Sequence, residues 1–261
     1  MSKSSPANTG GKTSTAPLGS FYASLIVVVA IAVCSITLSG SPSAAMPLLP
    51  AAGCLIGSVL AVGGVALEPP PSLHSPIQSR YTGRWSYLTF QTNVISALYF
   101  AMCMFTHLVP GTVLDEYVVP CFPLAFALDL LLTPLYYALD HFNAERLQKV
   151  QHWSKRGFPY VNVASHLCHA PGAVIAFVAA FSIREVPSAH ATTTGVCTYL
   201  IIYLSETVLN RWATGVWIYP VLEDVQKAAK LPGVAAFILA VCAVGASLAH
   251  LGKAIVELRL A

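Results

Sequence analysis

The sequence predicts an all-α protein, a polytopic bundle of about seven membrane helices. Of its 261 residues, 56% are hydrophobic and only 10% are charged, whereas soluble domains average about 25% charged residues. The apolar residues gather in runs of roughly 20, the length that an α-helix needs to cross a hydrocarbon core of about 30 Å. Lys and Arg also concentrate between alternate runs. These three observations argue against a water-soluble globular domain.

Apolar runs, separated by polar or Pro- and Gly-rich segments, predict seven spans. They cover residues 21–39, 45–67, 87–107, 118–139, 159–183, 195–212 and 231–251. The first run is longer than the apolar core of a signal peptide, so we expect it to be retained as a span. The second run is less regular, since it holds several Pro and Gly residues and follows a short turn.

The segments outside the spans predict two short tails. Residues 1–20 are rich in Ser, Thr, Gly and Pro, which is typical of a disordered tail, and residues 252–261 form a short C-terminal tail. The transmembrane domain is expected over residues 21–251. The connection at 140–159 is charged and amphipathic, and it fits either a helix along the membrane interface or a solvated connector.

Basic residues predict the orientation, because Lys and Arg collect in cytoplasmic loops. With seven spans and a cytoplasmic N-terminus, eleven of the 14 basic residues lie on the cytoplasmic side and three, Arg184, Lys253 and Arg259, on the other. Without the second span the division is nine against five. The pattern therefore favours a cytoplasmic N-terminus and a non-cytoplasmic segment after Leu251. The expected location is an endomembrane such as the endoplasmic reticulum, or the plasma membrane.

The net charge and the cysteines limit which partners the sequence indicates for this protein. The net charge is only +3 and the basic residues are dispersed, so the sequence shows no nucleic-acid footprint. The seven cysteines lie singly, without CxxC pairs or a disulfide framework. The pattern indicates the bilayer itself as the main partner, and it indicates no cofactor.

Polar side chains within the spans are the candidates for function, because they are expensive in hydrocarbon. They are Thr89, Gln91, Asn93, Asp129, Thr133, Asn162, His166, His169, Glu206 and Asn210. His166 and His169 are three residues apart and share a helix face. They fit half of a metal or haem site, a general base beside a hydroxyl nucleophile, or plain interhelical hydrogen bonding.

The carboxylates and amides leave further alternatives open. Asp129 precedes Pro134, which marks a kink where freed carbonyls seek polar partners. Glu206 and Asn210 share a face, and they either pair structurally or line a site. A small transporter or channel with Asp129, Glu206 and Asn210 at its midplane is therefore an alternative to an enzyme, although no inverted repeat is visible.

Four stretches occur in the order of a known family. They are "GRWSYLTFQTNVISALYF" (83–100), "CFPLAFALDLLLTPLYYALD" (121–140), "PYVNVASHLCHAPGAVIAF" (159–177) and "TGVWIYPVLE" (214–223). In these stretches the chain resembles the androgen-induced and androgen-dependent integral membrane proteins. Characterised members of that family hydrolyse fatty acid esters of hydroxy fatty acids. The resemblance implies a six-helix core from about residue 45, with the first span as an addition.

The resemblance also implies roles for particular residues. The family's threonine nucleophile corresponds to Thr89 and its histidine base to His169, while His166 matches the first histidine of the family's pair. A lipid ester would then be the substrate. The chain departs from the family pattern at Ser165, where the family has Asn, and at Ala170, where it has Thr. The sequence identifies no third catalytic group; Asp129, Asn162 and Glu206 are the candidates.

Overall fold

The computed structural model describes residues 45–66, 82–141 and 144–261, and all the regular elements among these residues are helical. The predicted first span, residues 21–39, and the predicted tail before it lie outside this part of the chain. Each of the other six predicted spans coincides with helical structure. The predicted all-α membrane bundle is therefore confirmed for the described residues.

The long helices follow the apolar runs closely. They are α2 (Leu48–Ala66), α3 (Leu88–Leu108), α4 (Asp115–Tyr136), α6 (Val161–His169), α7 (Pro171–Ser182), α8 (Ala189–Thr214) and α9 (Pro220–Leu260). Counting α6 and α7 as one segment, five are long and apolar enough to cross a membrane: α2, α3, α4, α6 with α7, and α9. Helix α8 has the length, at 26 residues, but is more polar.

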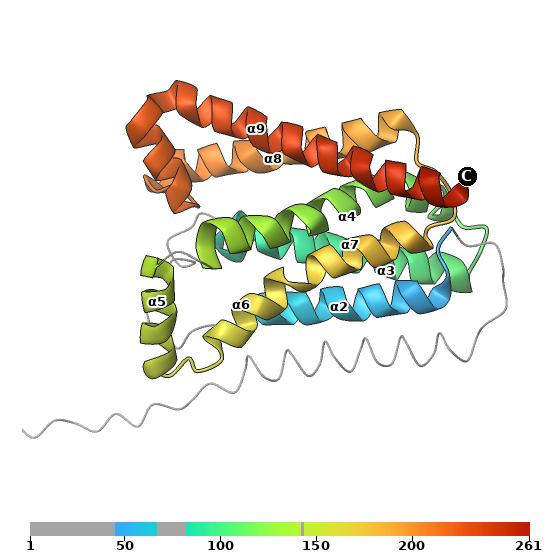
Figure 1. The fold of residues 1–261 in the computed structure, drawn as a ribbon, viewed down its shortest axis with the longest axis horizontal. Helices are drawn as coiled ribbons and strands as arrows, with labels where there is room; N and C mark the ends of the chain where they lie inside the picture. Colours follow the sequence, from blue (N-terminus) through green and yellow to red (C-terminus); the bar gives the residue numbers. More distant parts are fainter. Residues whose placement is uncertain (1–44, 67–81, 142–143) are drawn as a thin grey trace, which may run out of the picture.

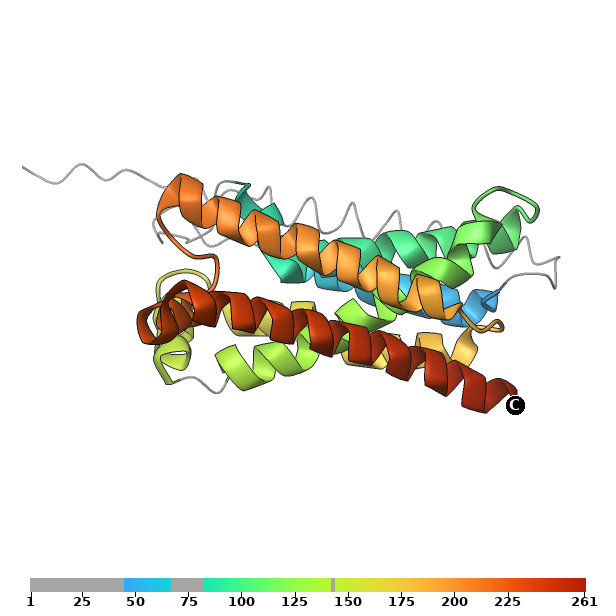
Figure 2. The same cartoon turned by 90° about the horizontal axis from the view of Figure 1, so that it is seen from above.

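Successive long helices run in alternating directions (Figure 1). Helices α2, α3, α4 and α7 pack around one core, in which Phe100, Phe122 and Phe126 are fully buried. Helices α8 and α9 pair with each other and pack on α4. Figure 2 shows this pair lying along the length of the bundle. As the sequence predicted, the third span (α3) and the fifth (α6 with α7) run in the same direction.

The fifth predicted span, 159–183, is two helices rather than one. Helix α6 ends at His169 and α7 begins at Pro171. Proline has no N–H to donate and its ring clashes with the preceding turn, so a continuous helix is interrupted at this point. The break places His169 at the end of a helix instead of in the middle of one.

The last two helices are longer than the apolar runs that predicted them. Helix α8 begins after Ser188, whose hydroxyl accepts a hydrogen bond of 3.1 Å from the Ala191 N–H. It ends at Gly215, whose φ of 73° is a left-handed conformation that glycine adopts without strain. Helix α9 is broken at Lys230 (φ 55°), two residues before Pro232. The predicted span 231–251 is the segment after this break, and the helix continues to Leu260.

The charged connection contains a helix, α5 (Ala144–Lys155), which lies across the end of the bundle (Figure 1). The segment is therefore helical, and its place at a membrane interface or in solvent remains a prediction. Helix α4 leads into this connection through a π-helical turn, Tyr137–His141. The predicted irregularity near Pro134 is therefore a π-turn that follows the proline. Such turns are frequent at functional sites.

Candidate functional site

Thr89 and His169 meet inside the bundle. The Oγ1 atom of Thr89, the second residue of α3, lies 3.0 Å from Nε2 of His169, the last residue of α6. Both side chains are partly buried. Helical side chains lean toward the N-terminus of their helix, so the imidazole points back toward the level of Thr89. A nucleophile needs its base within about 2.6–3.2 Å, and this pair satisfies that distance.

The hydrogen bond of the second ring nitrogen of His169 fixes which nitrogen carries the hydrogen. His169 Nδ1 lies 2.6 Å from the backbone carbonyl oxygen of Ser165, one turn earlier in α6. A carbonyl oxygen only accepts hydrogen bonds, so Nδ1 carries the hydrogen and donates it. In the neutral ring, Nε2 then holds the free lone pair and accepts from the Thr89 hydroxyl. This is the tautomer that a general base requires.

An aromatic ring holds the imidazole in its plane. The Tyr136 ring stacks on the His169 ring with a centroid distance of 3.8 Å and an interplanar angle of 9°. Beside it, the Tyr137 hydroxyl lies 2.9 Å from His166 Nδ1, and the His141 ring lies 4.9 Å from the His166 ring. His166 therefore belongs to a ring cluster next to His169. Its described hydrogen bond goes to a tyrosine and not to Thr89.

Tyrosines from α8 and α9 fix the start of the helix that carries Thr89. The backbone N–H of Leu88, the residue before Thr89, donates to the hydroxyl oxygens of Tyr203 (3.0 Å) and Tyr219 (2.9 Å). Tyr203 in turn donates to the Ser86 carbonyl at 3.2 Å. These bonds satisfy a helix N-terminal donor that has no partner within its own helix. Helix α8 and the residue directly before α9 thus set the position of Thr89.

Glu206 anchors the same segment from α8. One carboxylate oxygen accepts from the Thr82 hydroxyl at 2.7 Å, and the other accepts from Gln91 Nε2 at 2.9 Å. The Gln91 side-chain oxygen accepts from the Tyr199 hydroxyl at 2.9 Å. Thr82 and Gln91 flank Thr89 in the sequence, so Glu206 holds the segment on both sides of it. Its hydrogen bonds do not go to His169.

Asp129 lies in the centre of the bundle with a different partner. Its side chain is 1% exposed, and Oδ1 accepts from the Ser96 hydroxyl at 2.6 Å. Oδ2 has no hydrogen-bond partner within the described part of the chain. The backbone of Asp129 also contacts Gly172 at the start of α7: a Cβ added to Gly172 would lie 2.7 Å from the Asp129 carbonyl oxygen.

Asn162 and Asn210 lie apart from the Thr89–His169 pair. Asn162 is exposed on α6, seven residues before His169, which corresponds to roughly 10 Å along the helix. Asn210 is buried and donates to the Val216 carbonyl at 2.8 Å, so it supports the turn after α8. Neither amide therefore supplies the third catalytic group that the sequence left open. His169 Nδ1 is bonded instead to the backbone carbonyl of Ser165.

The geometry also bears on the two alternatives to an enzyme. Among residues 45–66, 82–141 and 144–261, no three His, Cys, Asp or Glu side chains form a group that could hold a metal ion. Asp129, Glu206 and Asn210 each hydrogen-bond to separate partners: Ser96, Thr82 with Gln91, and the Val216 carbonyl.

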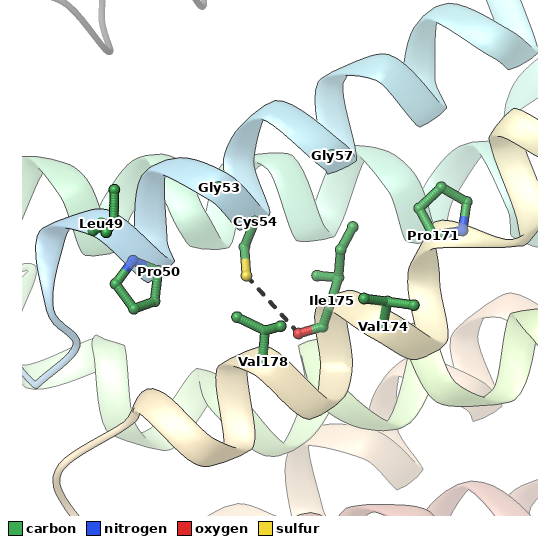
Figure 3. A pocket seen from close by; sticks show the side chains of 9 residues that line it. All are labelled: Leu49, Pro50, Gly53, Cys54, Gly57, Pro171, Val174, Ile175 and Val178. Atoms are coloured by element: carbon green, nitrogen blue, oxygen red, sulfur yellow. Dashed lines mark hydrogen bonds between the residues drawn. The ribbon is translucent and has the colours of Figure 1, made fainter.

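An apolar groove opens between α2 and α7 (Figure 3). Its volume is about 550 Å³, and its lining runs from Leu49 on α2 to Pro171 and Val178 on α7. Gly53 leaves the α2 side open, Ile175 packs against Gly57, and Cys54 faces the Ile175 carbonyl oxygen at 3.9 Å across the floor. The lining is suited to hydrocarbon. Thr89 and His169 do not line this groove.

Several residues of the site were not predicted from the sequence. Tyr136, Tyr203 and Tyr219 lie far from Thr89 in sequence or on other helices, and nothing in the helical periodicity pairs them with it. One signal was present: Pro171 lies in the middle of the fifth apolar run, and a proline there interrupts a regular helix.

The fold and the site together define a class: a polytopic helical membrane protein with a threonine–histidine pair inside the bundle. Comparison with known proteins identifies the family. The family described as FAR-17a/AIG1-like protein matches residues 66–257, and the chain belongs to this family. The chain is also similar to the androgen-induced gene 1 protein of Homo sapiens, at 24% identity over 188 residues, covering 61% of this chain and 72% of the relative. No solved structure matches the chain. The family membership expected from the four sequence stretches is confirmed.

Proposed function

We propose that this protein is an intramembrane threonine hydrolase that acts on lipid esters such as fatty acid esters of hydroxy fatty acids. The observation that carries the proposal is the 3.0 Å contact between the Thr89 hydroxyl and His169 Nε2, with His169 Nδ1 bonded to a carbonyl. A threonine hydroxyl is a weak nucleophile unless an adjacent base accepts its proton. The resemblance to ester hydrolases indicates the substrate class, and the lipid ester would reach the site from the bilayer.

The first half of the reaction transfers the acyl group to the protein. Thr89 Oγ1 attacks the ester carbonyl carbon while its proton passes to His169 Nε2. The tetrahedral intermediate collapses when the alkoxide of the hydroxy fatty acid leaves and takes that proton from Nε2. The products of this half are an acyl-threonine ester and a free hydroxy fatty acid. The Ser165 carbonyl stabilises the imidazolium through the Nδ1 hydrogen throughout.

The second half uses water. His169 Nε2 accepts a proton from a water molecule, which attacks the acyl-threonine carbonyl, and the proton then returns to Thr89 Oγ1. Throughout the cycle, Thr89 lies at the N-terminal end of α3, where the helix dipole favours the negative charge that develops on the carbonyl oxygen. The released fatty acid completes the hydrolysis.

The test is hydrolysis of a fatty acid ester of a hydroxy fatty acid by the purified full-length protein in detergent or bilayer discs. Thr89→Ala and His169→Ala should each lower kcat/KM by at least about 100-fold, because general-base catalysis contributes roughly 10²–10⁴. Thr89→Ser should keep measurable activity. A serine- and threonine-directed fluorophosphonate should label residue 89 of the wild type and not of Thr89→Ala.

Two matched controls separate catalysis from folding. Thr106→Ala removes a buried threonine at the other end of α3, whose hydroxyl bonds to the Cys103 carbonyl of its own helix. His250→Gln removes an exposed histidine of α9 that bonds to Thr193. Both should retain wild-type activity. Full activity of both Thr89→Ala and His169→Ala would refute the proposal.

The membrane and the orientation remain part of the proposal. Helix direction puts Arg84, Lys155 and Arg211 at the end of the bundle where α3 begins, and Arg184 and Arg259 at the opposite end. This separation of basic residues supports a cytoplasmic location for the first end. The active site would then open toward the cytoplasmic half of an endomembrane or the plasma membrane.

A further inference from the structure

The segment that carries His169 is held by side chains from other helices at the break between α6 and α7. In a continuous helix each N–H donates to the carbonyl four residues earlier. The Ala170 N–H still does so, to the His166 carbonyl at 2.8 Å. Pro171 has no N–H, so the Leu167 carbonyl loses its helical donor. A break of this kind inside a membrane bundle requires polar partners for the freed backbone groups.

Thr133 of α4 bridges one of the interrupted pairs. In a continuous helix the Ala173 N–H would donate to the His169 carbonyl. Here the Thr133 hydroxyl lies between the two: its oxygen accepts from the Ala173 N–H at 3.1 Å, and its hydrogen is donated to the His169 carbonyl at 2.6 Å. The single hydroxyl therefore joins the end of α6 to the start of α7. The hydroxyl therefore contacts the backbone of His169, whose imidazole is the proposed base.

Asn93 of α3 holds the preceding carbonyl. Its Nδ2 donates to the Cys168 carbonyl oxygen at 3.0 Å, and its side chain is 3% exposed. Asn93 lies one helical turn after Thr89 and on the same face of α3. The helix that carries the nucleophile is thus bonded directly to the backbone next to the base. Two parallel bonds, Thr89 to the His169 ring and Asn93 to the Cys168 carbonyl, span the same two helices.

We propose that Thr133 and Asn93 are positioning residues, which fix the last turn of α6 so that His169 Nε2 meets Thr89 Oγ1. This inference rests on the proposed function. The sequence marked both residues only as polar side chains within spans, and neither the motif resemblance nor the helical periodicity gave them a role beside His169. Neither side chain takes part in proton transfer. Their effect is on distance: a misplacement of about 1 Å between reacting groups costs about 100-fold in rate.

The test compares Thr133→Val with Thr133→Ser in the full-length protein. Valine keeps the branched shape and removes the hydroxyl, whereas serine keeps the hydroxyl. Thr133→Val should lower kcat for ester hydrolysis by about 10- to 100-fold with little change in KM. Thr133→Ser should restore most of the rate. Thr106→Val is the matched control, because it removes another buried hydroxyl that bonds within its own helix.

A readout that needs no substrate separates this inference from the proposed function. Diethyl pyrocarbonate modifies accessible imidazole nitrogens, and mass spectrometry can follow His169 by itself. Thr133→Val and Asn93→Leu should raise its modification rate several-fold over wild type, while Thr106→Val should not. If Thr89→Ala and His169→Ala both keep full activity, the hydrolase proposal fails and the modification rate alone judges the positioning role.

Two results would overturn the inference. One is a Thr133→Val protein whose kcat and His169 modification rate both lie within twofold of those of Thr106→Val. The other is a loss of rate in Thr133→Val that Thr133→Ser does not restore, because the hydroxyl would then not be the responsible group. Thermal unfolding of each variant, compared with that of Thr106→Val, shows whether a variant has lost stability as a whole. If Thr133→Val has, the rate of Thr133→Ser decides whether the hydroxyl positions His169.

Discussion

Gly172 allows α7 to approach the backbone of α4, and its replacement tests how tightly the site is packed. A Cβ at this position would lie 2.7 Å from the Asp129 carbonyl oxygen and 3.4 Å from the carbonyl carbon and Cα of the same residue. All three atoms belong to the backbone, so no side-chain rotation can relieve the clash. Ordinary carbon–oxygen contacts begin at about 3.3 Å, so α7 must move away from α4 by about 0.6 Å.

This displacement has a cost in stability and a cost in rate. Overpacking of a well-packed interior costs about 1–3 kcal/mol, so Gly172→Ala should lower the free energy of unfolding by that amount. Gly172 follows His169 by three residues and directly precedes Ala173, whose N–H the Thr133 hydroxyl joins to the His169 carbonyl. A shift of about 0.6 Å there should also lower the hydrolysis rate by about tenfold, on the scale of 100-fold per ångström.

The assay is thermal unfolding in detergent, read by intrinsic fluorescence, together with the ester-hydrolysis rate. Gly53→Ala in α2 and Gly195→Ala in α8 are matched controls, because a Cβ at either position meets nothing within 4 Å. Helical glycine is less favourable than alanine by about 0.5–1 kcal/mol, so both controls should equal or exceed wild-type stability. Gly172→Ala unfolding at or above the temperature of Gly53→Ala would refute the packing argument.

Two further predictions concern the anchor of α3 and the base. Glu206→Gln replaces one acceptor oxygen by an amide group, so it should lose one charge-assisted hydrogen bond and destabilise the protein by about 1–2 kcal/mol. Glu223→Gln, at a surface ion pair with Arg211, should change stability by less than about 0.5 kcal/mol. Equal effects of the two variants in thermal unfolding would contradict the anchoring role. In the proposed mechanism the neutral imidazole of His169 accepts the proton, so hydrolysis should decline in acid; the decline should persist in His166→Gln and be absent from the residual activity of His169→Gln. An acid decline that disappears in His166→Gln instead would reverse the roles of the two histidines.

Helix existence was predictable because it depends on local properties. Runs of about 20 apolar residues must satisfy their backbone hydrogen bonds internally in a membrane, so each of the six runs in the described chain is helical. Helix ends were less predictable. Helix α9 begins at Pro220, eleven residues before the apolar run at 231, because a polar amphipathic segment also forms a helix when it packs on a neighbour.

The sequence by itself determined the class of fold, the family, and the two residues, Thr89 and His169, on which the proposed chemistry depends. It placed them on helices that run in the same direction. Their 3.0 Å contact was decided by the tertiary structure, since it requires the break at Pro171, the Thr133 bridge and the tyrosines that hold Leu88. These contacts join residues 36 to 131 positions apart. Helical periodicity fixes which residues share a face of one helix, but only packing fixes the depth at which two helices align.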